Sequence, residues 1–445
     1  MLTITEIKNL LQTRKLGAVE LAEDILAKLE KNPYGATLCL NQEATLDQAK
    51  KAQKLIDSGD KRTLVGVPIM HKDVLVTKEW NTTAGSKILS GYKSPFNAEV
   101  VNRLSDNGMI CLGKTSCDEF AMGSANQNCA FGKCYNPWDP RAVPGGSSGG
   151  SAAVVSAGLV PAATGTDTGG SIRQPAAMCG ISGIKPTYGR VSRWGLIAYA
   201  SSLDQAGPIA RSALDCAILL DAMSGFDKKD STSLNVSNES FSDDLDAPFE
   251  SGNVTRPLAG LSLGVPEEYF SEALDNDVAV SVKNGIKSLE SMGAKIKTIS
   301  LPTTKFAVAA YYVVAPAEAS SNLSRFDGVR FGHRSANNKS LNELYINSRT
   351  EGFGEEVRRR ILVGTFVLSH GYYDAYYIQA LKVRRLVTMD FEEAFKSCDL
   401  IIGPTSPTVA WDHNKSPNIK NNIGVVGVPS EYLSDIYTVG ANLGG

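Results

Sequence analysis

The stretch that most constrains this chain runs over residues 143–185 and reads VPGGSSGGSAAVVSAGLVPAATGTDTGGSIRQPAAMCGISGIK. It holds two Ser-Gly clusters, residues 145–151 and 168–171, joined by small apolar residues with no charge before Asp167. Glycine has no Cβ, so such clusters let backbone N–H groups come close to a reacting atom or adopt positive φ. The apolar runs inside the stretch argue against a flexible linker, which is the usual interpretation of Gly/Ser-rich sequence.

A phosphate-binding loop is another interpretation, because glycine-rich turns before helices bind anions. However, no Lys-Ser or Lys-Thr follows Gly149-Gly150, and the chain has no G-x-G-x-x-G fingerprint. A scaffold that holds hydroxyl groups beside backbone donors fits better, and acyl transfer needs both. Ser147 and Ser171 are the candidate hydroxyls.

A serine nucleophile needs a base, which is usually histidine. The chain has four histidines, and one of them, His71, precedes Lys72 in a predicted strand. Neighbouring strand residues point to opposite faces, so only one of these two side chains can face the site. Lysine can act as a base if burial lowers its pKa, and an apolar run beside Lys72 provides that setting.

The rest of the chain predicts an α/β fold, and by size alone its 445 residues can form one large domain or two smaller ones. Helical spacing over 6–13, 19–30 and 41–58 predicts an N-terminal helical layer of about residues 1–60, with Thr5 capping its first helix. The core, about residues 61–445, alternates short strands with helices. Strand-helix-strand order indicates a parallel or mixed sheet covered by helices. The expected strands are 65–69, 109–113, 159–164, 261–265, 294–299 and 400–405, and the expected helices are 99–106, 277–293 and a pair over 358–387.

Composition adds limits on the compartment and on binding partners. The net charge of −2 gives no global attraction to nucleic acid. Eight scattered cysteines without a signal peptide favour reduced thiols in the cytoplasm. No C-x-x-C pair completes a zinc pattern, and no run approaches the ~20 residues that span a bilayer, so neither a metal nor a membrane is expected. The polar stretch 226–258 is interpreted as a surface loop.

The motifs around the two serines resemble those of the amidase signature family, GGSSGGS and DTGGSIRQPA. The spacings match as well: 171 minus 147 is 24, and 171 minus 72 is 99. The resemblance implies that Lys72 is the base, that Ser147 is a bridging serine on a cis peptide, and that Ser171 is the nucleophile. The oxyanion hole would be formed by the backbone N–H groups of Thr168, Gly169, Gly170 and Ser171. The resemblance also implies one amidase signature domain over residues 1–445, with a single large, mixed, mostly parallel central sheet covered by helices on both faces.

Within this family the chain is most similar to the glutaminase subunits of tRNA-dependent amidotransferases. The resemblance rests on CDEFAMGS (117–124), KPTYGRVSRWGL (185–196), ASSLDQ (200–205), EASSNLSRFDGVRFG (318–332) and RRRILVGTFVLSHGYYDAYY (358–377). It implies glutamine hydrolysis that supplies ammonia to convert Glu-tRNA(Gln) to Gln-tRNA(Gln), in a heterotrimer with partner subunits B and C. This chain would need no cofactor, ATP and Mg would bind at a partner subunit, and charged tRNA would be held mainly by that partner.

The same resemblance implies the residues that hold glutamine. An arginine, Arg359 or Arg360, would bind the α-carboxylate, and Asp435 would bind the amino group. Met122 and Gly123 would line the pocket. On the residues alone, helix-surface arginines and a capping aspartate remain an alternative.

Two other functions stay open from the sequence: a stand-alone amidase of another small amide, and an inactive structural subunit. The second follows from the end of the chain, because relatives continue past a block like ANLGG (441–445) with further strand and helix. We therefore expect the core to lack the family's C-terminal end. A version extended with a homologous tail should then melt at a higher temperature and bind glutamine more tightly.

Overall fold

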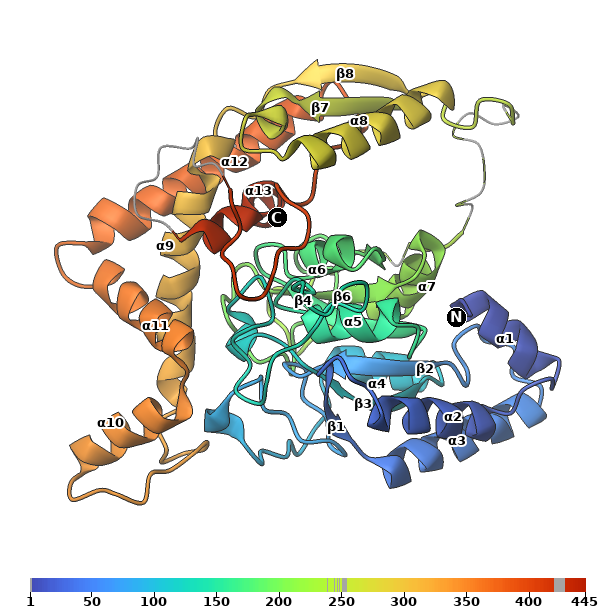
Figure 1. Cartoon of the computed structure of the whole chain (residues 1–445), viewed down its shortest axis with the longest axis horizontal. Helices are drawn as coiled ribbons and strands as arrows, with labels where there is room; N and C mark the ends of the chain where they lie inside the picture. The colour runs from blue at the N-terminus through green and yellow to red at the C-terminus, as the bar shows by residue number, and fades with distance from the viewer. Residues whose placement is uncertain are drawn as a thin grey trace. The chain divides into compact units, whose positions relative to one another are not determined.

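The computed structural model describes residues 2–237, 239–243, 245, 247, 249, 254–419 and 429–445. Its contacts group into two compact units, where the family resemblance implied one domain (Figure 1). Unit 1 comprises Met1–Ser242 and Glu318–Leu362, and unit 2 comprises Asp243–Ala317 and Val363–Gly445. The helices α9 (Thr304–Asn322) and α11 (Glu355–Val367) contribute residues to both units.

Unit 1 is built on a six-stranded sheet with the order β1-β3-β2-β4-β6-β5. Strand β2 is parallel to both β3 and β4, whereas the three outer pairs are antiparallel. Because β2 and β4 run in the same direction, their carboxyl ends meet at one edge of the sheet. The strands are β1 (Thr37–Leu40), β2 (Pro68–Lys72), β3 (Ile110–Thr115), β4 (Ala162–Asp167), β5 (Ser182–Gly183) and β6 (Gln205–Ala210).

Helices pack on this sheet and enclose the core of unit 1. Helix α5 packs against β2, β3, β4 and β6, while α3 packs against β3 and α7 against β6. Helix α5 buries nearly all of its residues, which explains its small apolar sequence. The helices of the unit are α1 (Ile4–Gln12), α2 (Ala18–Glu30), α3 (Gln42–Asp57), α4 (Glu99–Asp106), α5 (Gly149–Ser156), α6 (Arg173–Met178), α7 (Ala213–Met223) and α10 (Leu341–Gly352).

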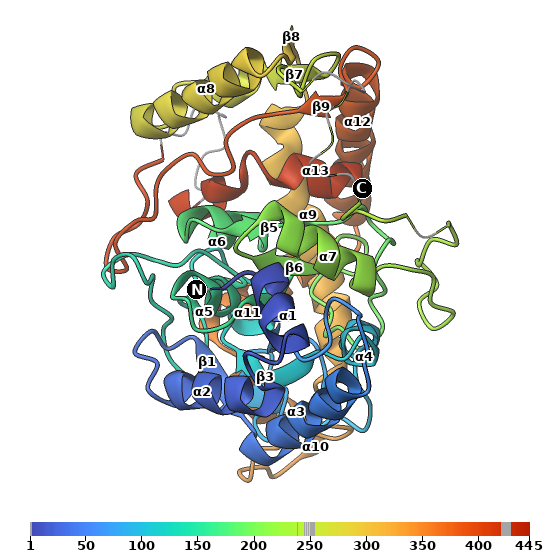
Figure 2. The same ribbon diagram turned by 90° about the vertical axis from the view of Figure 1, so that its right-hand side faces the viewer.

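The three helices predicted over residues 6–13, 19–30 and 41–58 are confirmed as α1, α2 and α3. Helices α2 and α3 lie side by side in both views (Figures 1 and 2). The prediction that Thr5 caps the first helix is wrong. The cap is Thr3, whose hydroxyl accepts a hydrogen bond from the Glu6 backbone N–H while the Glu6 carboxylate accepts one from the Thr3 N–H. This reciprocal pair satisfies two backbone donors that the first turn leaves free.

Two strands begin three residues later than predicted. The prediction started one strand at residue 65, but β2 begins at Pro68, because Gly66 has φ +81° and makes a turn. That turn is buried: a Cβ on Gly66 would lie 2.9 Å from Leu11 Cδ1. Apolar residues in a buried turn resemble a strand in sequence, and the same holds for the residues before β4. Lys72 and Asp167 are the last residues of β2 and β4.

Unit 2 contains a smaller sheet of three parallel strands with the order β8-β7-β9. The expected α/β fold with mixed, mostly parallel strand pairing is therefore confirmed. In the described part of the chain, however, the strands form two sheets instead of a single large one, because β7, β8 and β9 pair only with one another. The elements are β7 (Ser262–Pro266), β8 (Lys295–Ile299), β9 (Leu400–Ile401), α8 (Asn276–Ser291), α12 (Gln379–Ala394) and α13 (Val439–Gly444).

Two further properties concern the whole described chain. No helix in the described ranges has the length and apolar character needed to cross a bilayer. All eight cysteines are present as free thiols. Part of the predicted surface loop 226–258 falls outside the described residues.

Candidate active site

The predicted base and bridging serine are in direct contact. Lys72, the last residue of β2, is fully buried, and its Nζ lies 2.7 Å from the hydroxyl of Ser147. The same Nζ also donates to the hydroxyl of Thr166, at 2.8 Å, and to its carbonyl, at 3.4 Å. Thr166 belongs to β4, so the two neighbouring strands fix the direction of the lysine side chain.

Burial lowers the pKa of Lys72 to about 8, because an ammonium loses its hydration inside the protein. Nearby groups that carry negative charge when ionised, including Cys117, Asp118 and Asp167, oppose this shift and keep it moderate. An amine with a pKa near 8 is neutral in a useful fraction of molecules at neutral pH, and it can then accept a proton.

His71 is not in a position to replace Lys72. It is buried, its Nδ1 lies 3.2 Å from the hydroxyl of Thr164, and burial together with the charge of Lys114 lowers its pKa to about 3. The geometry therefore favours Lys72 as the base over its neighbour in the strand, an alternative that the sequence had left open.

Ser147 follows a cis peptide bond, between Gly146 and Ser147. Its carbonyl accepts a hydrogen bond from the backbone N–H of Asp118, at 3.2 Å. The buried Asp118 carboxylate in turn accepts hydrogen bonds from the backbone N–H groups of Asn126, at 2.8 Å, and Asn128, at 3.1 Å. Sequence reasoning singled out the motif that contains Asp118 but gave this residue no role; it joins the loop after β3 to the bridging serine.

Gly146 has no room for a side chain. A Cβ there would lie 2.2 Å from Asp118 Oδ2 and 2.6 Å from the backbone nitrogen of Ala125. We therefore expect Gly146→Ala to lower the free energy of unfolding by at least about 3 kcal/mol, since backbone atoms would have to move. Gly285→Ala is the control: nothing lies within 4 Å of the position that a Cβ would take there, in α8, so it should stabilise by about 0.5 to 1 kcal/mol. Thermal and urea unfolding measure both, and equal stability of Gly146→Ala and the native chain would contradict the packing described.

Ser171 closes the turn that follows β4. Its carbonyl accepts a hydrogen bond from the backbone N–H of Ser148, at 3.2 Å, which ties the two serine clusters together. The residue is 8% exposed, and its hydroxyl has no hydrogen-bond partner among the described residues. Ser171 is thus nearly buried with an unbonded hydroxyl, as the predicted nucleophile requires, although the nucleophilic role itself stays a prediction.

The backbone N–H groups of residues 168–171 are also unpaired in the described part of the chain. Buried or half-buried backbone donors are almost always paired, so four unpaired ones in succession mark a binding site. An oxyanion that forms at the carbon attacked by Ser171 would satisfy them. Thr168, Gly169 and Gly170 therefore have the free donors that the predicted oxyanion hole requires, although the oxyanion role itself stays a prediction.

An ion pair that the sequence did not reveal supports this turn. The buried carboxylate of Asp167 lies 2.9 Å from Arg173 and also accepts a hydrogen bond from the backbone N–H of Ile172, at 3.1 Å. A carboxylate that bonds across a turn fixes the backbone of that turn. The N–H groups of residues 168–171, which lie within the turn, are left free by the described residues. The signal in the sequence was the D-x-x-x-x-x-R spacing within DTGGSIR.

The structure distinguishes the two arginines proposed to bind the substrate. Arg359 is exposed and pairs with Glu355 and Glu356 on its own helix. Arg360 is 4% exposed, and besides pairing with Glu356 it donates to the hydroxyl of Tyr199, at 2.8 Å. A buried guanidinium held by an aromatic hydroxyl is the better candidate for a carboxylate ligand.

The other proposed substrate residues are placed as follows. Met122 is fully buried, and its carbonyl accepts a hydrogen bond from the side chain of Asn128. Gly123 packs on the carboxylate of Asp118, which leaves no space for a Cβ. Asp435 belongs to unit 2, where Tyr312 donates a hydrogen bond to it at 2.9 Å. The role of Asp435 in binding the substrate beside Ser171 stays a prediction.

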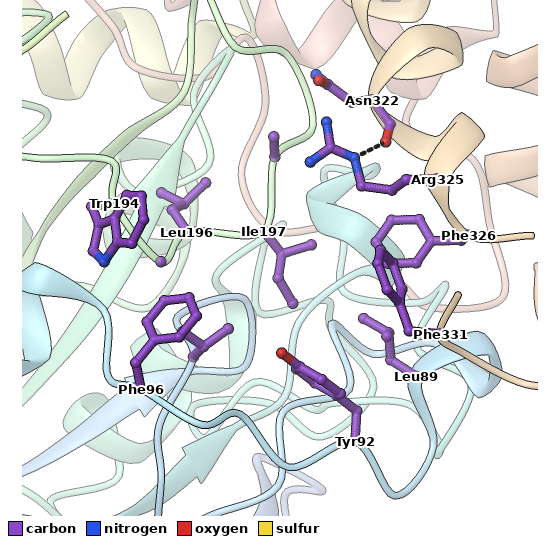
Figure 3. A pocket seen from close by; sticks show the side chains of 13 residues that line it. Leu89, Tyr92, Phe96, Trp194, Leu196, Ile197, Asn322, Arg325, Phe326 and Phe331 are labelled. Atoms are coloured by element: carbon purple, nitrogen blue, oxygen red, sulfur yellow. Dashed lines mark hydrogen bonds between the residues drawn. The ribbon is translucent and has the colours of Figure 1, made fainter. Parts of the chain in front are cut away.

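A cavity of about 250 Å³ opens elsewhere in unit 1 (Figure 3). Its lining is mostly apolar and includes five aromatic rings, together with the polar side chains of Asn322 and Arg325. Lys72, Ser147 and Ser171 are not among its lining residues. It is lined by Val76, Leu89, Tyr92, Phe96, residues 194–198, Asn322, Arg325, Phe326 and Phe331.

Comparison with known proteins agrees with this geometry. The A subunit of glutamyl-tRNA(Gln) amidotransferase of Paraburkholderia xenovorans is 56% identical over 446 residues, which cover 100% of this chain and 88% of that protein. The crystal structure of the A subunit of glutamyl-tRNA(Gln) amidotransferase from Thermotoga maritima is 43% identical with a TM-score of 0.69, covering 85% of this chain and 74% of that one. The peptide amidase of Stenotrophomonas maltophilia is 27% identical with a TM-score of 0.79, covering 98% and 88%.

The match to a family is equally extensive. Residues 20–445 match the amidase family, which includes the strands, the two serine clusters and the buried lysine described above. This chain therefore belongs to the amidase family.

Proposed function

We propose that this chain is the glutamine-hydrolysing subunit of a glutamyl-tRNA(Gln) amidotransferase. Two relatives that carry the name of that subunit support the proposal, with 56% and 43% identity. The single observation that carries the chemistry is the contact of 2.7 Å between the buried Lys72 and Ser147, beside a serine turn with free backbone donors.

The proposed reaction begins when Ser171 Oγ attacks the carboxamide carbon of glutamine. Ser171 gives its proton to Ser147, whose own proton passes to neutral Lys72. The carbonyl oxygen becomes an oxyanion held by the free N–H groups of residues 168–171, each such donor being worth roughly 3 kcal/mol in the transition state. The C–N bond then breaks, the proton from Lys72 returns to the leaving nitrogen through Ser147, and ammonia departs. Water cleaves the resulting ester by the same route in reverse and releases glutamate.

Arg360 is the arginine that we assign to the α-carboxylate of glutamine. Burial and the contact with Tyr199 limit its side chain to one direction, which reduces the entropy lost on binding. Asp435 remains the proposed partner of the amino group, and Met122 and Gly123 the proposed pocket wall. No metal or cofactor enters any of these steps.

The ammonia would be used in a complex with two partner subunits, B and C. ATP and Mg would act at a partner subunit, which would also hold most of the charged tRNA, since this chain has a net charge of only −2. Conversion of Glu-tRNA(Gln) to Gln-tRNA(Gln) belongs to translation and is proposed to occur in the cytoplasm.

The test is to co-express the chain with B and C subunits of a glutamyl-tRNA(Gln) amidotransferase and to purify the complex. We expect glutamate and ammonia release from glutamine, and Gln-tRNA formation when ATP, Mg and Glu-tRNA(Gln) are added. Full turnover of simple amides by the chain alone would instead indicate a stand-alone amidase. A complex that forms Gln-tRNA from free ammonia but not from glutamine would indicate an inactive structural subunit.

A further inference from the structure

Asp204 is a buried carboxylate bonded to the turn that carries the nucleophile. Its Oδ1 accepts a hydrogen bond from the hydroxyl of Thr168, at 2.6 Å. The same carboxylate accepts hydrogen bonds from the backbone N–H of Tyr199, at 2.9 Å, and from that of Ala200, at 3.1 Å. Thr168 is the first residue of the turn 168–171, so Asp204 holds the start of the row of free donors.

No cation pairs with this carboxylate in the described part of the chain, and Asp204 is only 2% exposed. A buried carboxylate without a cation costs free energy unless several donors satisfy it. Burial accordingly raises the pKa of Asp204 to about 6, although the bonds from Thr168, Ala200 and Tyr199 oppose this shift. A buried carboxylate that costs free energy is retained where its hydrogen bonds hold neighbouring segments in one arrangement.

Asp204 also anchors the residue that holds the substrate arginine. Tyr199 donates its backbone N–H to Asp204, and its hydroxyl accepts a hydrogen bond from Arg360. The guanidinium of Arg360 also lies over the Tyr199 ring, 5.5 Å from its centroid. Asn322, which lines the cavity in Figure 3, supports the same segment by donating to the carbonyl of Tyr199, at 3.1 Å.

We propose that Asp204 is a positioning residue that fixes the oxyanion turn, through Thr168, and Arg360, through Tyr199, relative to each other. It touches neither Ser171 nor the substrate. By holding both, it sets the distance between the point where the acyl group reacts and the point where the substrate's carboxylate binds. The inference rests on two parts of the proposed function, acyl transfer at Ser171 and binding of a substrate carboxylate by Arg360, but not on glutamine as the substrate.

The test compares Asp204→Asn, Thr168→Val and Tyr199→Phe in the purified complex. A misplacement of about 1 Å near a reacting centre can cost about a hundredfold in rate. We expect Asp204→Asn to lower kcat for glutamine by roughly 10- to 100-fold, and Thr168→Val, which keeps the backbone N–H, to lower kcat by roughly tenfold with KM unchanged. Tyr199→Phe should raise KM with little change in kcat, because it affects only Arg360.

The double variant Asp204→Asn with Thr168→Val separates positioning from general damage. If both act through one hydrogen bond, the double variant should be little slower than Asp204→Asn alone, because coupled residues are not additive. Asp215→Asn is the matched control. That carboxylate is also buried and also accepts a backbone N–H, from Ile4 at 3.0 Å, but it lies in α7, which carries no triad residue. It should lower the melting temperature without changing kcat.

A substrate-independent readout distinguishes failure of this inference from failure of the proposed function. A fluorophosphonate probe reacts with an activated serine without any need for Arg360. Its rate of labelling at Ser171 should fall in Asp204→Asn and Thr168→Val and stay unchanged in Tyr199→Phe. If labelling is slowed in Asp204→Asn and Thr168→Val but neither the native chain nor any variant hydrolyses glutamine, the inference stands and glutamine is rejected as the substrate. Labelling at the native rate in both Asp204→Asn and Thr168→Val, or additive losses in the double variant, would overturn the inference.

Discussion

Ser171→Ala should fold normally and lose glutamine hydrolysis by roughly 10⁴- to 10⁶-fold, as expected when a serine nucleophile is removed. The hydroxyl of Ser171 has no hydrogen-bond partner among the described residues, so its loss breaks no contact that supports the fold. Mass spectrometry of the native chain after reaction with a glutamine-like electrophile should find the adduct on Ser171, and the Ser171→Ala chain should remain unlabelled.

Ser156→Ala is the matched control for this prediction. Its hydroxyl is bonded to the carbonyl of Cys179, at 2.7 Å, and plays no part in the site, so activity should stay near the native value. Cys179 itself is an unsuitable nucleophile, because burial raises the pKa of its thiol to about 12. An adduct on Cys179 or Ser147, with Ser171 unmodified, would show that the nucleophile has been assigned wrongly.

Lys72→Arg should reduce glutamine hydrolysis by at least about a hundredfold, in keeping with general-base contributions of ~10² to 10⁴. Arginine remains charged at every accessible pH and cannot accept the proton of Ser147. The control is Lys185→Arg. Burial lowers the pKa of Lys185 to about 8 as well, but its Nζ donates to the carbonyl of Pro186, at 2.7 Å, so this variant should keep most of the activity.

The pH dependence tests the same assignment in the native chain. Because the base is neutral Lys72 and its pKa is about 8, kcat/KM should rise with pH, reach half of its maximum near pH 8 and level off above it. A rate that is flat between pH 7 and 9, together with near-native turnover of Lys72→Arg, would contradict the assignment of Lys72 as the base.

Much of the local structure could be predicted from the sequence. The helix expected at 99–106 is α4, Glu99–Asp106, without any shift, and the N-terminal helices agree to within about two residues. Amphipathic spacing repeats over several turns, so it is hard to mistake. The short strands were displaced by up to three residues, because the turn at Gly66 is as apolar and as buried as the strand that follows it.

The sequence by itself determined which residue types can carry out the chemistry, since the two long Ser-Gly motifs and the lysine 99 residues before the second serine are specific to one family. Only the tertiary structure decided how they act. The contact between Lys72 and Ser147 joins residues 75 positions apart, because α5 packs on β2 and β4 and the loop before α5, which carries Ser147, is hydrogen-bonded through Ser148 to Thr166 in β4. Adjacent arginines look equivalent in sequence, but packing buries Arg360 and exposes Arg359. Asp204 gave no chemical signal of its own, because the role of a buried carboxylate depends on its hydrogen-bond donors, which distant segments supply.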